Sequence, residues 1–145
     1  MKLILQRVLS SSVYVNGREI TKISKGLTIL FGVEKNDSNK QAEYLAEKTL
    51  NLRVFHDEQR KMNRSCLDIG GEILVVSQFT LAGCCEKGRR PDFARAALPE
   101  QAEKLYRFFI DQLLASGLKV ATGQFGVDML LDIQNDGPVT FILER

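Results

Sequence analysis

The sequence predicts an α+β domain, with a mostly antiparallel or mixed, barrel-like β-sheet and two main helices. The 145 residues are 44% apolar and 26% charged, a balance typical of a globular chain that buries about two thirds of its unfolded surface. Two segments have helical spacing and roughly eight or nine have the patterns of strands. Because helices and strands do not alternate, a doubly wound sheet is disfavoured. We therefore expect residues 1–145 to form a single domain.

The N-terminal segment predicts a strand followed by a hairpin. Residues 2–9 alternate loosely between apolar and polar side chains. Two further strand-like runs, 12–15 and 18–23, flank Asn16 and Gly17. Asn-Gly favours a type I′ hairpin turn because both central positions of that turn need a positive φ.

A buried strand and the first helix are expected next. Residues 27–33 are a continuous apolar run, which indicates a strand buried on both faces. Ser38 and Gln41 then have the spacing of a capping box, and apolar residues recur at helical spacing behind them. We expect a helix over about residues 39–51 and a short strand over 52–55.

The second half of the chain repeats this order. Residues 60–71 are expected to be a loop, and the apolar, β-branched run 72–79 a central strand. An exposed basic loop over 84–95 precedes Pro99, which suits the first turn of the second helix. The closing strands are expected at 118–125, 127–133 and 139–143, with a turn at 135–138.

Residue counts and motifs disfavour several classes of protein. His56 is the one histidine, so a catalytic triad or a histidine-rich metal site is a poor interpretation. The three cysteines lack a Cys-x-x-Cys pair and fit a reducing compartment. No glycine-rich nucleotide-binding motif is present, so we expect no metal and no cofactor. The apolar runs are too short for a membrane span and the N-terminus lacks a secretory pattern, so we expect a cytoplasmic protein without a membrane partner.

Three polar segments could carry chemistry. Ser77, Gln78, Phe79 and Thr80 end an apolar strand, where hydroxyl, amide and backbone N–H groups could stabilise an oxyanion and Phe79 could stack on a planar ring. An ordinary strand end is the alternative.

The other two segments are rich in glycine. Gly137 and Pro138 lie in Asn-Asp-Gly-Pro-Val-Thr, where a rigid carbonyl pair could face a ligand, although a simple turn is the alternative. Phe125 lies between two glycines with Met129 nearby, a pattern that also fits a sheet corner.

Charge is modest overall and clustered locally. The formal net charge of +2 does not indicate an extended nucleic-acid surface. Two clusters could each contact a few phosphates or be solvated loops. They are Arg60, Lys61 and Arg64, and Lys87, Arg89, Arg90 and Arg95.

Taken together, these motifs resemble the D-aminoacyl-tRNA deacylase family, also called D-tyrosyl-tRNA deacylases. The resemblance rests most on Ser-Gln-Phe-Thr at 77–80 and Asn-x-Gly-Pro-x-Thr at 135–140, which are specific as a pair. It also runs through Gln-Arg-Val at 6–8, Gly-Leu at 26–27, Gly-Val-Glu-Lys at 32–35, Lys-Met-Asn at 61–63, Arg-Pro-Asp-Phe at 90–93 and Thr-Gly-Gln-Phe at 122–125. Departures are minor: Ser10, Ser11 and Ser12 stand where relatives tend to have an alanine before the serine, and Cys84 and Cys85 fall in a variable loop.

The resemblance implies a homodimeric hydrolase with active sites at the subunit interface. It would release D-amino acids, and glycine mischarged on tRNA-Ala, from the 3′ end of tRNA, as quality control of translation, with tRNA rather than DNA as partner. The four residues Ser77, Gln78, Phe79 and Thr80 would line the catalytic pocket. Gly137 and Pro138 would be a cis pair that enters the other subunit's site, holds the substrate's amino group and rejects L side chains, with Arg7 orienting the pair.

The resemblance also implies supporting contacts and leaves the mechanism open. Phe125 and Met129 would line the adenosine pocket, and Lys87, Arg89, Arg90 and Arg95 would contact tRNA phosphates. Thr80 has no evident base partner, so water attack assisted by the tRNA ribose is favoured over a covalent nucleophile. Two alternatives remain: a non-catalytic RNA-binding or dimerisation module, and a metal-dependent hydrolase that uses Asp128 and Asp132.

Overall fold

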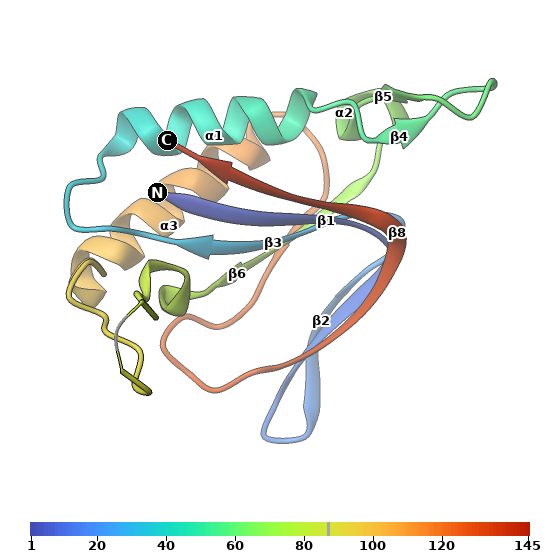
Figure 1. Cartoon of the computed structure of the whole chain (residues 1–145). Coiled ribbons are helices and arrows are strands. Elements are labelled where there is room, and N and C mark those ends of the chain that lie inside the picture. Colours follow the sequence, from blue (N-terminus) through green and yellow to red (C-terminus); the bar gives the residue numbers. More distant parts are fainter. Residues whose placement is uncertain (87) are drawn as a thin grey trace.

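A strongly curved mixed sheet organises the chain, and two long helices pack on one side of it (Figure 1). The computed structural model describes residues 1–86 and 88–145. Within the sheet, β3 pairs in parallel with β6 and β6 in parallel with β7, whereas β1 pairs antiparallel with β2, β3 and β8. The strands are β1 (Lys2–Val15), β2 (Arg18–Ile23), β3 (Gly26–Gly32), β6 (Glu72–Ser77), β7 (Val120–Thr122) and β8 (Leu130–Glu144). The predicted α+β class with a mixed, barrel-like sheet is confirmed.

Strands β1 and β8 are longer than the sequence patterns predicted. β1 is continuous over its 14 residues, where we expected two separate strands, and Asn16 and Gly17 form the predicted hairpin turn with φ values of 50° and 76°. β8 is continuous over 15 residues. The predicted turn at 135–138 is therefore wrong, because these residues lie within one strand and do not separate two. Gln6 pairs with Thr140 and Val8 with Asn135, which leaves residues 136–139 bulged opposite Arg7. We call residues 135–139 the β8 bulge.

Both predicted helices are present. α1 spans Asn39–Asn51, and the N–H of Ser38 donates to Gln41 Oε1 at 3.0 Å, as the capping box predicted. α3 spans Pro99–Leu114 with Pro99 in its first turn, the position where a missing N–H costs nothing. Their apolar stripes pack on the sheet through residues such as Leu45 and Phe109.

The segment between α1 and β6 has more structure than we expected. β4 (Phe55–His56) and β5 (Met62–Arg64) form a small hairpin that projects from the body of the molecule (Figure 1). The predicted loop at 60–71 also contains α2 (Cys66–Ile69). Ser65 and Asp68 form a capping box for this short helix, a signal present in the sequence.

Apolar packing occurs on both faces of the central strands. One core lies between the sheet and the helices and includes Ile29, Val75 and Phe109. A second core, which includes Val8 and Leu74, lies inside the curve of the sheet. This explains the long apolar runs of β3 and β6, and it confirms the burial on both faces that was predicted for the run 27–33.

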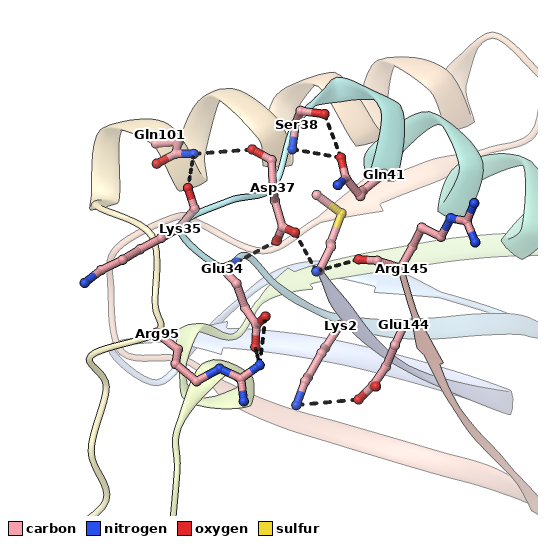
Figure 2. A network of polar contacts seen from close by, with 11 residues as sticks. Lys2, Glu34, Lys35, Asp37, Ser38, Gln41, Arg95, Gln101, Glu144 and Arg145 are labelled. Atoms are coloured by element: carbon pink, nitrogen blue, oxygen red, sulfur yellow. Dashed lines mark hydrogen bonds and ion pairs between the residues drawn. The ribbon is translucent and has the colours of Figure 1, made fainter.

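Polar contacts join both ends of the chain, and α3, to the loop that precedes α1 (Figure 2). The Met1 ammonium donates to Asp37 Oδ1 at 2.7 Å and to the carbonyl oxygen of Arg145 at 2.9 Å. Gln101 of α3 donates to the carbonyl oxygen of Lys35 at 3.1 Å. Within the described residues, no helix has the length and apolar character needed to cross a membrane.

Candidate active site at the end of strand β6

Strand β6 ends at Ser77 and turns at once into a short 3₁₀ helix, η1 (Phe79–Ala82). The N–H of Gln78 still donates to the carbonyl oxygen of Phe31 at 2.8 Å, so the turn begins at a fixed point beside β3. A Cβ on Gly32 would lie 2.7 Å from Leu81 Cβ, closer than carbon atoms approach. Glycine at position 32 therefore lets η1 pack over the end of β3. This packing holds residues 77–80 next to the end of β3.

A cavity of about 410 Å³ opens where η1 faces the segment between β7 and β8. One wall comes from β6 and η1, and the other from residues 125–129 and 131. The lining residues are Val76, Ser77, Gln78, Phe79, Pro99, Phe125, Gly126, Val127, Asp128, Met129 and Leu131. Asp128 is the one ionisable side chain among them, so the cavity is largely uncharged.

The structure brings five of the predicted pocket residues together. Ser77, Gln78 and Phe79 line one wall, and Phe125 and Met129 line the other. The sixth, Thr80, is exposed beside the cavity, where its hydroxyl accepts a hydrogen bond from Gln78 Nε2. The site therefore offers hydroxyl and amide groups next to exposed aromatic surface, which suits binding a planar ring and stabilising a developing oxyanion.

The far wall of the cavity is supported from behind. The Phe125 ring packs against Tyr106 of α3 with 5.7 Å between ring centroids. The Tyr106 hydroxyl donates to the carbonyl oxygen of Val75 at 2.8 Å, and burial raises the pKa of this hydroxyl above its usual range, so it stays a donor. A Cβ on Gly123 would lie 2.7 Å from Met129 Sδ, so glycine allows Met129 to pack there.

Gly137 and Pro138 lie elsewhere, in the β8 bulge. The peptide bond between them is cis, and neither residue lines the cavity. Asn135 Nδ2 donates to the carbonyl oxygens of Arg7 at 2.9 Å and Val139 at 3.1 Å, so one amide connects both ends of the bulge to β1. The structure of one chain therefore does not bring the two signature segments together.

Arg7 is the buried cation that holds the bulge. Its side chain is 3% exposed, and its Nε lies 2.9 Å from Asp136 Oδ2 and donates to the Asp136 carbonyl oxygen at 3.1 Å. One terminal nitrogen donates to the carbonyl oxygen of Val54 at 2.6 Å. Arg7 thus joins the bulge to the segment that enters the β4–β5 hairpin.

The predicted phosphate contacts lie in the loop after η1. Arg89 and Arg90 are exposed there, and Lys87 lies outside the described residues. Arg95 forms an ion pair with Glu34 at 3.2 Å, so part of its charge is already neutralised within the chain.

The alternative metal site has little support in the geometry. Asp128 and Asp132 are both exposed. In the part of the chain that the structure describes, no three His, Cys, Asp or Glu side chains are grouped so that they could hold a metal ion.

Several residues that shape these two regions were not predicted from the sequence in these roles. Asn135 and Asp136 hold the N-terminal end of the bulge to Arg7, although their place beside Gly-Pro was a signal. Pro99 lines the cavity, and nothing local to this position indicated it. Asp128 lines the cavity too, although the sequence suggested it only as a metal ligand.

The chain is similar to known proteins over nearly its whole length. The family model described as D-Tyr-tRNA(Tyr) deacylase matches residues 4–144. A protein of Geotalea uraniireducens named D-aminoacyl-tRNA deacylase is 54% identical over 144 residues, covering 99% of this chain and 93% of that protein. A protein of the same name from Thermosipho melanesiensis is 52% identical over 145 residues, with 99% and 97% of the two chains covered.

Two solved structures are also similar. One, described as c-Myc DNA Unwinding Element Binding Protein, has a TM-score of 0.94 and 46% identity, and covers 100% of this chain and 99% of that chain. The other, a probable eukaryotic D-amino acid tRNA deacylase, has a TM-score of 0.85 and 17% identity, and covers 98% and 97% of the two chains. At that identity the second likeness concerns the fold alone.

Proposed function

The chain belongs to the D-Tyr-tRNA(Tyr) deacylase family, and from this premise we propose that it hydrolyses the ester between a D-amino acid and the 3′-terminal adenosine of tRNA. The observation that carries the proposal is the cavity at the end of β6, where Ser77, Gln78 and Phe79 face Phe125 and Met129. The products are the free D-amino acid and tRNA. In the cytoplasm this reaction would recycle mischarged tRNA and protect translation.

The cavity suits the terminal adenosine and the ester carbonyl. The rings of Phe79 and Phe125 and the thioether of Met129 offer apolar and stacking surface to an adenine. Ser77 and Gln78 carry the hydroxyl and amide groups nearest to the strand end, where the reacting carbonyl would lie. The volume of about 410 Å³ is in the usual range for small-ligand sites.

The reaction needs little from acid–base side chains because the substrate ester is already activated. A water molecule attacks the carbonyl carbon, the bond from that carbon to the ribose oxygen breaks, and the ribose oxygen takes the proton. The neighbouring ribose hydroxyl assists this transfer. The protein's part is to orient the ester and stabilise the oxyanion, with Thr80 and Gln78 supporting the site rather than forming a covalent bond.

The β8 bulge would select the substrate's handedness. We assign the Gly137 and Pro138 carbonyls to the substrate's amino group, and the rigid backbone around them to the exclusion of an L side chain. Glycine has no side chain to exclude, so glycine mischarged on tRNA-Ala would also be hydrolysed. Arg7 and Asn135 support this role because they hold the bulge in one conformation.

A homodimer would unite the two regions. The bulge lies outside the cavity of its own chain, so it would act in the cavity of a partner subunit. Leu9 on β1 is 56% exposed and Ile142 on β8 is 67% exposed, so the two strands that flank the bulge carry exposed apolar side chains that association could bury.

The first test compares D-tyrosyl-tRNA with L-tyrosyl-tRNA, each incubated with the purified protein and with EDTA present. We expect rapid loss of the D ester while the L ester persists. Loss of activity on exhaustive chelation would favour the metal-dependent alternative. Equal hydrolysis of both esters would contradict the role of the β8 bulge.

Nucleic-acid binding without turnover is the second candidate function. The solved structure with 46% identity has a name that refers to DNA binding by that protein. This name is the observation that supports the second candidate. Tight binding of uncharged tRNA or of DNA with neither ester hydrolysed would favour it over the deacylase.

A further inference from the structure

Phe93 lies beside the cavity without lining it, and nothing in the proposed chemistry uses it. Phe93 is 38% exposed and Phe79 is 61% exposed, and their ring centroids lie 5.1 Å apart. The two rings are tilted by 56° to each other. They form a stepped aromatic surface that begins at the cavity wall and continues away from it.

The backbone holds Phe93 in a fixed position. Cys84 and Asp92 exchange two backbone hydrogen bonds of 2.8 and 2.9 Å, which close the basic loop immediately before Phe93. The N–H of Ala96 donates to the Phe93 carbonyl oxygen at 3.0 Å. A Cβ on Gly83 would lie 3.0 Å from Phe93 Cε1, so the ring packs closely on the glycine backbone. An exposed ring held in this way loses little conformational freedom when a ligand stacks on it.

The charges near the cavity favour a path for a polyanion that runs from the cavity towards Phe93. Arg90 stands three positions before Phe93 and Arg89 one position earlier, and both are exposed. A neighbouring hollow on the other side of Phe125 contains Glu103 and Asp111, together with Arg107. By sequence, residues 84–95 carry four basic side chains and two acidic ones, Glu86 and Asp92. This excess of positive charge favours a phosphodiester that leaves the cavity towards Phe93 over one that leaves towards the α3 side.

We propose that Phe93 is the stacking platform for the penultimate nucleotide of the tRNA, with its phosphodiester lying towards Arg89 and Arg90. Exposed aromatic rings next to arginines are the usual means of binding single-stranded RNA, and stacking accepts any base. This inference rests on the proposed function, because the terminal adenosine must occupy the cavity for the next nucleotide to reach Phe93.

Two substrates separate this role from a structural one. D-tyrosyl-tRNA contains the penultimate nucleotide, whereas 3′-O-D-tyrosyl-adenosine lacks it. The Phe93→Leu variant keeps apolar volume and removes the aromatic face. We expect it to lower kcat/KM for the tRNA ester by about 5- to 100-fold, mainly through KM, and to leave the nucleoside ester unchanged.

Two further variants serve as controls. Phe93→Tyr keeps the aromatic face and should retain the activity of the wild type on both substrates. Tyr44→Leu makes the same kind of change at an aromatic residue that is 43% exposed on α1, and should affect neither substrate. Melting temperatures of all three variants show whether each is folded.

Equal losses on the two substrates would overturn the proposal, because Phe93 would then only support Phe79. An unchanged kcat/KM for the tRNA ester would overturn it as well. If the wild-type protein hydrolyses neither substrate, the proposed function fails. The inference about Phe93 is then decided by the affinities of the wild type and of Phe93→Leu for uncharged tRNA and for adenosine. A lower affinity of the variant for tRNA, with an unchanged affinity for adenosine, supports the inference, whereas equal changes in the two affinities contradict it.

Discussion

The cavity at the end of β6 and the β8 bulge are built in different ways. The cavity is made from η1 and the segment after β7, and apolar packing against Tyr106 and Gly123 holds its walls. The bulge is held by a buried cation, Arg7, and by the amide of Asn135. The first is a hollow within one chain, and the second lies outside that hollow.

This difference suggests a division of labour. A largely uncharged hollow suits adenosine and an ester carbonyl, which need shape and hydrogen bonds. The proposed role of the bulge is different: its backbone carbonyl groups would test the substrate sterically, from a second chain. Each region can therefore be perturbed separately, with different consequences.

The largest expected effect concerns the stability of the bulge. Arg7→Ala leaves Asp136 and the carbonyl oxygen of Val54 without their buried partner, and should lower the free energy of unfolding by about 3 kcal/mol. Urea denaturation measures this loss. Arg7→Lys keeps the positive charge but lacks the several N–H donors of the guanidinium. Its free energy of unfolding should lie between those of the wild type and Arg7→Ala. A change below about 1 kcal/mol would show that packing, not Arg7, holds the bulge.

The next effect concerns chemistry at the cavity. Thr80→Val keeps the shape of the side chain and removes the hydroxyl that accepts from Gln78. We expect kcat for D-tyrosyl-tRNA to fall by about 100-fold, the typical cost of losing one group that stabilises an oxyanion, with no change in D-over-L preference. Single-turnover kinetics provides the check. The contrary result would be an aminoacyl ester trapped on the Thr80 hydroxyl of the wild-type enzyme, together with complete loss of activity in the variant. Thr80 would then be the nucleophile.

A pair of glycine variants compares the two regions directly. A Cβ on Gly137 would lie 2.8 Å from Asn135 Oδ1, so Gly137→Ala must shift the bulge and should reduce D-over-L preference by about tenfold. A Cβ on Gly123 would lie 2.7 Å from Met129 Sδ, so Gly123→Ala should weaken hydrolysis of the D ester without altering that preference. The ratio of kcat/KM for D- and L-tyrosyl-tRNA gives the result. If both variants change the ratio alike, the two regions do not have separate roles.

The smallest effect uses the cysteines as reporters. Burial raises the pKa of the Cys66 thiol to about 12, so it stays protonated and should resist alkylation at pH 8. Cys85 is exposed in the loop after η1 and should react. Uncharged tRNA should slow the labelling of Cys85 several-fold, as peptide mass spectrometry would show. Unchanged labelling would place the RNA away from this side of the cavity.

Local sequence signals predicted the elements that depend on local interactions. Ser38 with Gln41 marked the start of α1, Asn16 with Gly17 marked the hairpin, and the apolar runs marked β3 and β6. These signals work because caps, turns and burial act over a few residues.

The elements that depend on distant residues were harder to predict. Residues 135–138 have the composition of a turn, yet pairing with β1 continues on both sides and makes them a bulge within one strand. The contact between Arg7 and Asp136 joins positions 129 apart, and no local pattern reports it. The pocket residues were predicted from a family resemblance, because the strand end alone did not distinguish Ser77 from an ordinary serine. Phe93 was predicted only as part of a motif.

The most direct test of the account asks whether the cavity and the bulge of two different chains form one site. A cavity variant carrying Gln78→Ala and Thr80→Val is mixed with a bulge variant, Gly137→Val, under conditions that allow subunits to exchange. If each is inactive alone, random pairing leaves one intact site in half of the dimers, so about a quarter of wild-type D-tyrosyl-tRNA hydrolysis should return. No recovery, with mixed dimers confirmed by native mass spectrometry, would contradict the claim that the bulge completes its partner's active site.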